Sequence, residues 1–345
     1  MKIFINARCF DKPLTGVQRY LQCVSAGLDQ IDIQPEFIKP KPCFSSGLLG
    51  YFWEQFVLPF KIKNHGLLWS PANLGPIFYS NQVVTIHDIA WFDHPEWFKK
   101  QYVKIYRFII PLLLKRVRLI LTVSEYSKQR IMDVFGVPEN KIQVTGLFLD
   151  PSFCPGSDAK IALILKKHAL NKPYVLCVAS LEPRKNIQRL LEAWGNLKSF
   201  HPSYDLVVIG SAGNVFKNTG LTKASEGAIF LGRVADEDLP DLYSGASVFA
   251  YPSLYEGFGL PILEAMTCGV PVLSSNKTSI PEVAGNAAYL VDPYSIEEIT
   301  NGLSNLLSDK ALRDSLIQKG FERLAVFSRE NGMRKFKEAF ENLDE

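Results

Sequence analysis

Short apolar runs alternate with longer segments of helical periodicity through the first half of this 345-residue chain. The apolar runs have the length of buried strands and lie at residues 2–6, 67–69, 82–86 and 119–123. Apolar residues recur at helical spacing over residues 17–28, 102–117 and 125–135. Strands that alternate with helices predict a parallel α/β layer.

The second half restarts this pattern after a turn-rich connection at residues 151–172. Asn186 is expected to cap a helix whose apolar residues begin at Ile187. The expected strands lie at residues 174–179, 206–209, 229–231, 247–251, 270–274 and 289–291. A chain of this length exceeds what one core usually organises. We therefore predict two α/β domains, over residues 1–165 and 166–325, followed by a helical segment at 326–345.

The most informative segment is PSLYEGFGLPILEAMTCG at residues 252–269, which follows the expected strand at 247–251. Pro261 favours the start of a helix and Gly269 its end, so we expect a helix from Pro261 to Cys268. Ligands of open α/β sheets bind at such strand ends, and a helix N-terminus attracts phosphate. Glu256 and Glu264 would repel a diphosphate, but they suit sugar hydroxyls. The pattern favours a nucleotide sugar over the alternative of a surface turn with two solvated glutamates.

A second polar group follows the expected strand at 174–179, in the sequence SLEPRKN at residues 180–186. Arg184 and Lys185 stand there directly before a helix. Taken alone, they read as two solvated cations. Their place at a strand end of the same sheet as the glutamates instead favours binding of a diphosphate, whose charge they would neutralise without a metal.

Composition excludes several classes of protein. The chain has 38 basic and 35 acidic residues, and a net charge of +3 argues against a dedicated nucleic-acid binder. Its six cysteines form no C-x-x-C pair, which is typical of a reducing compartment and not of a zinc site. No apolar run is long enough for a membrane span, and the N-terminus does not read as a signal peptide. We expect a cytoplasmic protein.

The chain resembles the retaining glycosyltransferases of the GT4 family, and the resemblance spans nearly all of it. The segments that carry it include VASLEPRKNIQRLLEAW, LVVIGSAG, LYEGFGLPILEAMTCGVPVLSSN and IPEVAGNAAYLVDP in the second half, with VVTIHD and TVSEYSK in the first. The resemblance implies a GT-B fold, in which two Rossmann-like α/β/α domains face each other across a cleft. It also leads us to expect residues 326–345 to pack back on the first domain.

The resemblance also implies roles for individual residues. Glu256 would contact hydroxyls of the donor sugar, and Glu264 would hold the ribose. Arg184 and Lys185 match the pair that binds phosphate, and His87 matches a histidine that reaches the donor sugar. Backbone groups from Gly232 to Val234 would contact the base, and the amides of Phe258, Gly259 and Leu260 would face the sugar and diphosphate. Gly16 matches a loop that packs near the diphosphate and the acceptor.

By resemblance, the reaction is a retaining front-side transfer, in which the departing diphosphate helps to deprotonate the acceptor hydroxyl. No metal and no cofactor are expected. We expect GDP-mannose as the donor, with UDP-hexoses as the alternative, and a glycan on a lipid carrier as the acceptor. The pathway would be the synthesis of a surface polysaccharide such as O-antigen or capsule.

Residues 97–118 hold seven Lys or Arg among aromatic and aliphatic residues. Two interpretations stay open. The segment is either a basic amphipathic helix on the inner membrane face, anchored by Trp91, Trp97 and Phe98, or an ordinary half-buried helix with a solvated basic side. Pro111 is expected to kink it.

Three other classes of protein fit less well. A nucleotide-sugar epimerase of the same fold is disfavoured by the pair of glutamates. A non-catalytic, lectin-like descendant is disfavoured because Arg184, Lys185, Glu256 and Glu264 are all present. A dinucleotide-dependent dehydrogenase is disfavoured because the pair Gly257 and Gly259 lacks the third glycine of a dinucleotide-binding motif and does not follow the first strand.

Overall fold

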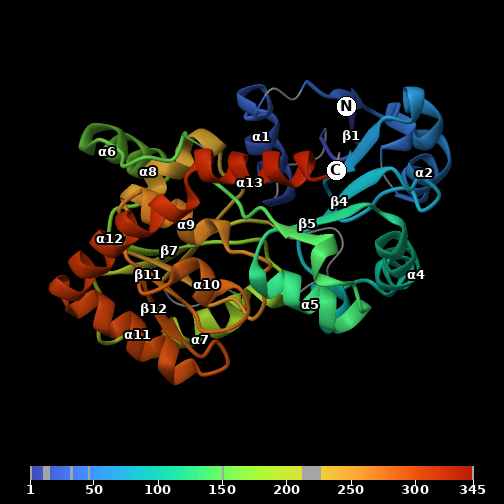
Figure 1. The fold of residues 1–345 in the computed structure, drawn as a ribbon. Coiled ribbons are helices and arrows are strands. Elements are labelled where there is room, and N and C mark those ends of the chain that lie inside the picture. The colour runs from blue at the N-terminus through green and yellow to red at the C-terminus, as the bar shows by residue number, and fades with distance from the viewer. Residues whose placement is uncertain are drawn as a thin grey trace. The chain divides into compact units, whose positions relative to one another are not determined.

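In a computed structural model, the protein is described for residues 2–10, 16–31, 34–45, 47–149, 151–211 and 227–343. The chain forms two compact units (Figure 1). The first unit comprises residues 1–93, 100–148 and 327–345, and the second comprises residues 94–99 and 149–326.

The first unit is built on a parallel six-stranded sheet in the order β2-β1-β3-β4-β5-β6. Its strands are β1 (Ile3–Asn6), β2 (Glu36–Ile38), β3 (Leu67–Ser70), β4 (Gln82–Ile86), β5 (Leu119–Thr122) and β6 (Ile142–Val144). The four apolar runs of the first half are thus confirmed as strands. The sequence pattern missed β2 and β6, because each has only three residues and lies at a sheet edge.

The helices of the first unit include one from the far end of the chain. They are α1 (Gly16–Ser25), α2 (Gly47–Phe52), α3 (Ala90–Asp93), α4 (Lys100–Arg116), α5 (Glu125–Phe135) and α13 (Arg329–Glu341). Phe336 and Phe340 of α13 share the core of this unit with Trp69 of β3, and the Trp69 and Phe336 ring centroids lie 4.9 Å apart. The C-terminal helix therefore completes the apolar core beneath the first sheet.

The second unit repeats the architecture with a parallel sheet in the order β12-β11-β10-β7-β8-β9. Its strands are β7 (Tyr174–Val178), β8 (Asp205–Ile209), β9 (Ala228–Gly232), β10 (Val248–Tyr251), β11 (Val272–Ser275) and β12 (Ala288–Val291). The chain runs outward from β7 through β8 to β9, and then returns to place β10 on the other side of β7. The strand order therefore reverses between β7 and β10, which is where open α/β sheets bind ligands.

Helices flank this second sheet. They are α6 (Asp158–Lys167), α7 (Ile187–Lys198), α8 (Leu239–Ser244), α9 (Leu260–Thr267), α10 (Ile280–Ala284), α11 (Ile296–Ser308) and α12 (Lys310–Leu324). The helix expected at 261–268 is α9, shifted by one residue. It ends in a Schellman motif, in which the Val270 amide donates to the Ala265 carbonyl while Gly269 adopts a φ of +71°.

The expected boundary at residue 165 is wrong, because the chain enters the second unit at residue 149. The turn-rich connection contains α6, which packs against α8. Lys167 and His168 both contact Asp238, at 2.7 Å and 2.9 Å, and so fasten the end of α6 to the second unit.

Within the described residues, no helix is long and apolar enough to cross a membrane. Trp91 and Phe98, which the sequence analysis expected as membrane anchors, are buried, and Trp97 is half-buried. Trp91 and Phe98 therefore cannot enter a bilayer in this fold.

Candidate active site

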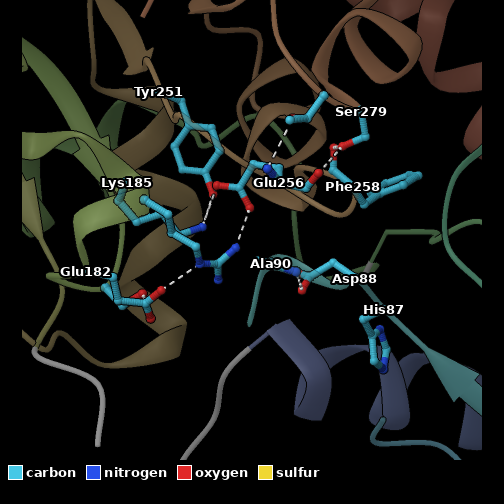
Figure 2. A network of polar contacts seen from close by, with 12 residues as sticks. His87, Asp88, Ala90, Glu182, Lys185, Tyr251, Glu256, Phe258 and Ser279 are labelled. Carbon is cyan, nitrogen blue, oxygen red and sulfur yellow. Dashed lines mark hydrogen bonds and ion pairs between the residues drawn. The ribbon is translucent and has the colours of Figure 1, made fainter. Parts of the chain in front are cut away.

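Arg184 and Lys185 follow β7, and Glu256 follows β10, so these residues lie at the reversal point of the second sheet. The Lys185 Nζ donates to Glu256 Oε1 at 2.6 Å, and an Arg184 Nη donates to Glu256 Oε2 at 3.2 Å (Figure 2). Both oxygens of Glu256 thus accept from a cation. The sequence-predicted phosphate-binding pair and the first motif glutamate form one cluster.

Tyr251, the last residue of β10, completes this cluster. Its hydroxyl accepts from Lys185 Nζ at 2.5 Å, and the same ammonium lies 5.0 Å from the centroid of the Tyr251 ring. Tyr251 is buried, so the hydroxyl and the ammonium meet away from solvent. Sequence reasoning missed this residue because it reads as the last member of an apolar strand. A polar atom at the carboxyl end of that strand was the available signal.

Burial dominates the electrostatics of the cluster. It lowers the pKa of Lys185, as does the charge of Arg184, while Glu256 opposes the change. Burial alone would raise the pKa of Glu256, but the charges of Lys185 and Arg184 outweigh it and hold that pKa below its usual range. Glu256 is therefore a carboxylate at neutral pH, paired with two cations.

Glu182 holds Arg184 in place. The Arg184 Nε donates to Glu182 Oε2 at 2.8 Å, and the Ser180 hydroxyl donates to the other oxygen of the same carboxylate. Glu182 is buried. The guanidinium is thus fixed between two carboxylates, and its direction is set by the loop after β7. Glu182 lies in the segment SLEPRKN, and nothing in the sequence alone indicates this role for it.

The turn between Glu256 and α9 is tied down by the segment before α10. The Ser279 hydroxyl lies 2.9 Å from the carbonyl oxygens of both Glu256 and Phe258, and the Thr278 hydroxyl accepts from the Glu256 amide at 3.1 Å. Gly259 adopts a φ of +110° directly before α9, a backbone conformation that residues with a Cβ atom rarely adopt. Phe258, Gly259 and Leu260 thus form the N-terminal end of α9, where helix amides lack intrahelical partners.

The second motif glutamate, Glu264, is buried in α9 and accepts from the Tyr243 hydroxyl at 2.9 Å. Gly232 ends β9 with a φ of +67°, and its carbonyl accepts from the Gly210 amide at 2.8 Å. Val234, two residues on, is half-buried. These positions follow strands of the same sheet. The motif segment LVVIGSAG, at residues 206–213, is described only as far as Ser211.

Asn186 occupies the N-cap position of α7 as expected, but its side chain makes no capping hydrogen bond to the helix amides. It precedes the helix with a φ of 58°, and its side-chain amide donates instead to the carbonyls of Pro252 at 3.0 Å and Pro293 at 2.6 Å. The left-handed backbone turns the side chain away from the helix amides. Asn186 therefore ties the loop after β7 to the loop after β10, and so holds the two halves of the charged cluster in register.

His87 and Gly16 belong to the first unit. The His87 Nε2 lies 2.8 Å from the Pro71 carbonyl, which can only accept, so Nε2 carries the proton and Nδ1 is the acceptor of the neutral ring. Burial lowers the pKa of His87, against weaker opposing effects of Pro71 and Asp88. Asp88 accepts from the Ala90 amide at 3.1 Å and so caps the turn that follows (Figure 2).

Gly16 is the first residue of α1 and is exposed. Its φ is not positive, and a Cβ built there meets no atom within 4 Å. Neither backbone strain nor packing in the described structure therefore requires glycine at this position. The preceding residue, Thr15, lies outside the described residues.

Comparison with known proteins places these features in a family. A profile described as glycosyl transferases group 1 matches residues 162–323. The O-antigen chain mannosyltransferase B of Escherichia coli is 40% identical over 372 residues, which covers 96% of this chain and 97% of that protein. The O-antigen chain mannosyltransferase RfbU of Salmonella typhimurium is 30% identical over 74% of this chain and 69% of its own length.

The fold also matches solved structures. Anabaena Alr3699/HepE, solved in complex with UDP and glucose, aligns with a TM-score of 0.74 over 99% of both chains at 19% sequence identity. Such low identity shows a common fold and nothing finer. The structural match shows the GT-B fold. The profile match and the near full-length similarity to the Escherichia coli enzyme establish that this chain belongs to the group 1 glycosyltransferases.

Proposed function

We propose that this protein transfers mannose from GDP-mannose to a growing glycan in the synthesis of an O-antigen-type polysaccharide. The observation that carries the proposal is the cluster of Arg184, Lys185 and Glu256 at the reversal point of the second sheet. The choice of mannose rests on the 40% identity to an O-antigen chain mannosyltransferase over nearly the full length of both chains.

The donor would lie along the carboxyl ends of the second sheet. Glu256 would accept hydrogen bonds from hydroxyls of the mannose, and Glu264 from those of the ribose. Backbone groups of Gly232 and Val234 would contact the base. Within the described residues, Lys185 uses two of its three N–H donors, on Glu256 and Tyr251, so the ammonium has one more to offer a phosphate oxygen.

The leaving diphosphate would gain its stabilisation from Arg184, Lys185 and the N-terminal amides of α9. In the proposed front-side reaction, the acceptor oxygen bonds to the anomeric carbon as the bond from that carbon to the phosphate oxygen breaks. The hydroxyl proton passes to the departing phosphate, so the configuration is retained and no enzyme carboxylate is consumed. Two fixed cations supply the charge that this step needs, and we propose that no metal is required.

Two residues of the first unit would take part as well. His87 presents Nδ1 as an acceptor in its neutral form, which suits a hydroxyl of the donor sugar. Gly16 would leave space for the diphosphate or the acceptor, since nothing in the described structure fills the position of its missing Cβ.

The acceptor is proposed to be a saccharide on a lipid carrier, at the cytoplasmic face of the membrane. The six cysteines all lie within the described residues and form no disulfide there, which agrees with a reducing compartment. The proposal assigns no role to nucleic acid.

A transfer assay tests the proposal. Purified protein is given GDP-mannose or UDP-glucose with a mannose-terminated oligosaccharide, and release of the nucleoside diphosphate and the anomeric configuration of the product are measured. We expect turnover with GDP-mannose, retention of configuration, and no loss in the presence of a chelator. Lys185→Met and Glu256→Gln should each lower kcat at least about a hundredfold, as is typical for loss of electrostatic stabilisation.

The control is Lys310→Met, which removes an exposed lysine of α12 and should leave kcat unchanged. Turnover with UDP-glucose alone would replace GDP-mannose by a UDP-hexose as the donor. Near-normal rates in both Lys185→Met and Glu256→Gln would contradict the site assignment. Donor binding without any turnover would favour a non-catalytic nucleotide-sugar-binding protein.

A further inference from the structure

Both backbone polar groups of Glu256 are held by the hydroxyl side chains of two consecutive residues, Thr278 and Ser279. The Glu256 amide donates to the Thr278 hydroxyl at 3.1 Å. The Ser279 hydroxyl lies 2.9 Å from the carbonyl oxygens of both Glu256 and Phe258 (Figure 2). We call the Thr278 and Ser279 hydroxyls the hydroxyl clamp. The clamp fixes the main chain of the residue whose carboxylate stands at the centre of the candidate site.

Thr278 adopts a backbone conformation that its residue type disfavours. Its φ is +57°, in the left-handed region, and no other β-branched residue in the described part of the chain has a positive φ. A left-handed backbone is unfavourable for any residue with a Cβ atom, and a branched Cβ adds to the crowding. Such conformations persist only where the surrounding structure fixes them, and they gather at functional sites.

Hydrogen bonds on both sides of Thr278 fix this conformation. Before it, the Asn276 amide donates to the Val291 carbonyl at the end of β12, at 2.9 Å. After it, Ser279 is fully buried, and its carbonyl accepts from the Val283 amide of α10 at 3.0 Å. The turn between β11 and α10 is thus held at both ends, so Thr278 cannot relax without the loss of these bonds.

The left-handed turn explains how two neighbouring side chains reach the same residue. Consecutive side chains of an extended strand point to opposite faces of the sheet. Here the left-handed Thr278 is followed by Ser279 with a φ of −78° and a ψ of −9°, so the chain changes hand between them. One hydroxyl then meets the amide of Glu256 and the other its carbonyl. The strained conformation therefore makes the clamp possible.

The bonds of the Glu256 carboxylate are of a different kind. One of its oxygens accepts from Lys185 at 2.6 Å and the other from Arg184 at 3.2 Å. These are the cations proposed to meet the diphosphate, so a bound donor would share them with the carboxylate. The clamp joins main-chain atoms to hydroxyls and does not depend on the ligand. It is the part of the hold on Glu256 that persists when the donor is bound.

We propose that Thr278 is a positioning residue for the transfer. Its strained backbone places the hydroxyl that holds the Glu256 amide, and the carboxylate is thereby kept aligned with the hydroxyls of the donor sugar during the reaction. The inference rests on the proposed role of Glu256 in sugar binding. Alignment that matters mainly in the transition state changes kcat more than KM. The nucleotide itself would still be held by Arg184, Lys185 and Glu264.

Three substitutions separate the hydroxyl from the strain. Thr278→Val keeps the branched side chain and its strain but removes the hydroxyl, Thr278→Gly removes both, and Thr278→Ser keeps the hydroxyl. Steady-state kinetics with GDP-mannose should show kcat about tenfold lower in Thr278→Val and Thr278→Gly, with KM within about twofold, as expected for a small misplacement at the site. Thr278→Ser should retain a near-natural kcat.

Thermal melting distinguishes this role from a purely structural one. Glycine accepts a positive φ without steric cost, so Thr278→Gly should melt about 2–4 °C above Thr278→Val. The two variants should nevertheless share the same low kcat. If Thr278 served stability alone, kcat would follow the melting temperature and the glycine variant would be the more active of the two.

A double-mutant cycle tests whether Thr278 acts through Glu256. Thr278→Val added to Glu256→Gln should change kcat by no more than about twofold, because the carboxylate that it positions is already absent. The matched control is Thr300→Val, which removes a half-buried hydroxyl of α11 that donates to the Ile296 carbonyl at 2.8 Å. This control should leave kcat unchanged.

Hydrogen exchange at the Glu256 amide tests the clamp without donor or acceptor. The amide should exchange at least about tenfold faster in Thr278→Val and Thr278→Gly than in the natural protein and Thr278→Ser, because it has lost its acceptor. Unchanged exchange beside normal turnover would contradict the clamp alone. Absence of turnover with every donor would contradict the proposed function and, with it, this role of Thr278.

Three kinetic results would also overturn the proposal. These are a near-natural kcat in Thr278→Val or Thr278→Gly, a kcat in Thr278→Ser as low as that of Thr278→Val, and a further tenfold loss when Thr278→Val is added to Glu256→Gln.

Discussion

Replacement of Lys185 by Met should destabilise this protein far more than loss of an exposed lysine. The Lys185 ammonium lies 2.6 Å from Glu256 Oε1, and both side chains are more than nine-tenths buried. Coulomb's law at an effective dielectric constant of about 20 gives roughly 6 kcal/mol of attraction at that distance. Met keeps the volume of the side chain but leaves the carboxylate with Arg184 as its remaining cationic partner, 3.2 Å away. Removal of one partner from a buried pair typically costs about 3–5 kcal/mol.

Urea unfolding of four proteins measures this effect: the natural chain, Lys185→Met, Glu256→Gln, and the double variant. We expect Lys185→Met to lower the free energy of unfolding by about 3–5 kcal/mol. The double variant should recover part of that loss, because the buried carboxylate that lost its closer cationic partner is then neutral. The matched control is Lys310→Met, whose ion pair with Asp314 has the same 2.6 Å distance but is exposed. It should cost less than about 1 kcal/mol.

The pH dependence provides a second readout. The pKa of Glu256 is below its usual value in the folded protein, so its contribution to stability is complete above the unfolded pKa and is lost as the pH falls through the folded one. Glu256→Gln should therefore lose less stability than the natural protein on acidification below about pH 4.5. A cost for Lys185→Met no larger than that for Lys310→Met, or strictly additive losses in the double variant, would refute the reasoning.

Three further variants test other parts of the site. Tyr251→Phe removes the hydroxyl that contacts Lys185, and steady-state kinetics should show kcat reduced about tenfold with little change in the melting temperature; an unchanged kcat would show that the hydroxyl does not position Lys185. Gly259→Ala introduces a side chain at a φ of +110° and should lower the free energy of unfolding by about 1–3 kcal/mol. Gly16→Ala should keep the stability of the natural protein but lose turnover. A destabilised Gly16→Ala and an unaffected Gly259→Ala would contradict both assignments. Burial lowers the pKa of His87, so the unfolded chain binds a proton that the folded one does not, and stability should fall below about pH 6.5, by up to about 1.4 kcal/mol per pH unit. His87→Asn should lessen this slope in urea unfolding, and parallel slopes would show that the pKa of His87 is the same in the folded and unfolded states.

Much of the fold follows from the order of apolar runs, because buried parallel strands are continuous stretches of Val, Ile and Leu. The runs at β4 and β7 illustrate this, since each is buried along almost its whole length. The three-residue edge strands β2 and β6 carry no comparable signal. The domain boundary was misplaced for a different reason. A turn-rich sequence does not show which core the following α6 joins, and that is decided by the contacts of Lys167 and His168 with Asp238.

The charged residues of the site were predictable because they stand at strand ends within spaced motifs. Their mutual arrangement was not. Sequence places Lys185 and Glu256 71 positions apart, and only the reversal of strand order brings them into contact. The partners of Asn186 were not predictable either. Its residue type favours a helix cap, but its backbone is left-handed and its side chain donates to the carbonyls of Pro252 and Pro293. The local sequence predicted a side-chain cap for α7, whereas tertiary contacts use the same side chain to join two loops.

The central claim is that the second unit binds a nucleotide sugar through the cluster around Glu256. Thermal melting with GDP-mannose, UDP-glucose, UDP-galactose and UDP-N-acetylglucosamine tests it most directly. A ligand at about 100 times its Kd adds roughly 2.7 kcal/mol to the stability of the folded state. The account predicts a higher melting temperature with GDP-mannose alone, and no such shift in Lys185→Met or Glu264→Gln. No shift with any donor, or an equal shift in those variants, would contradict it.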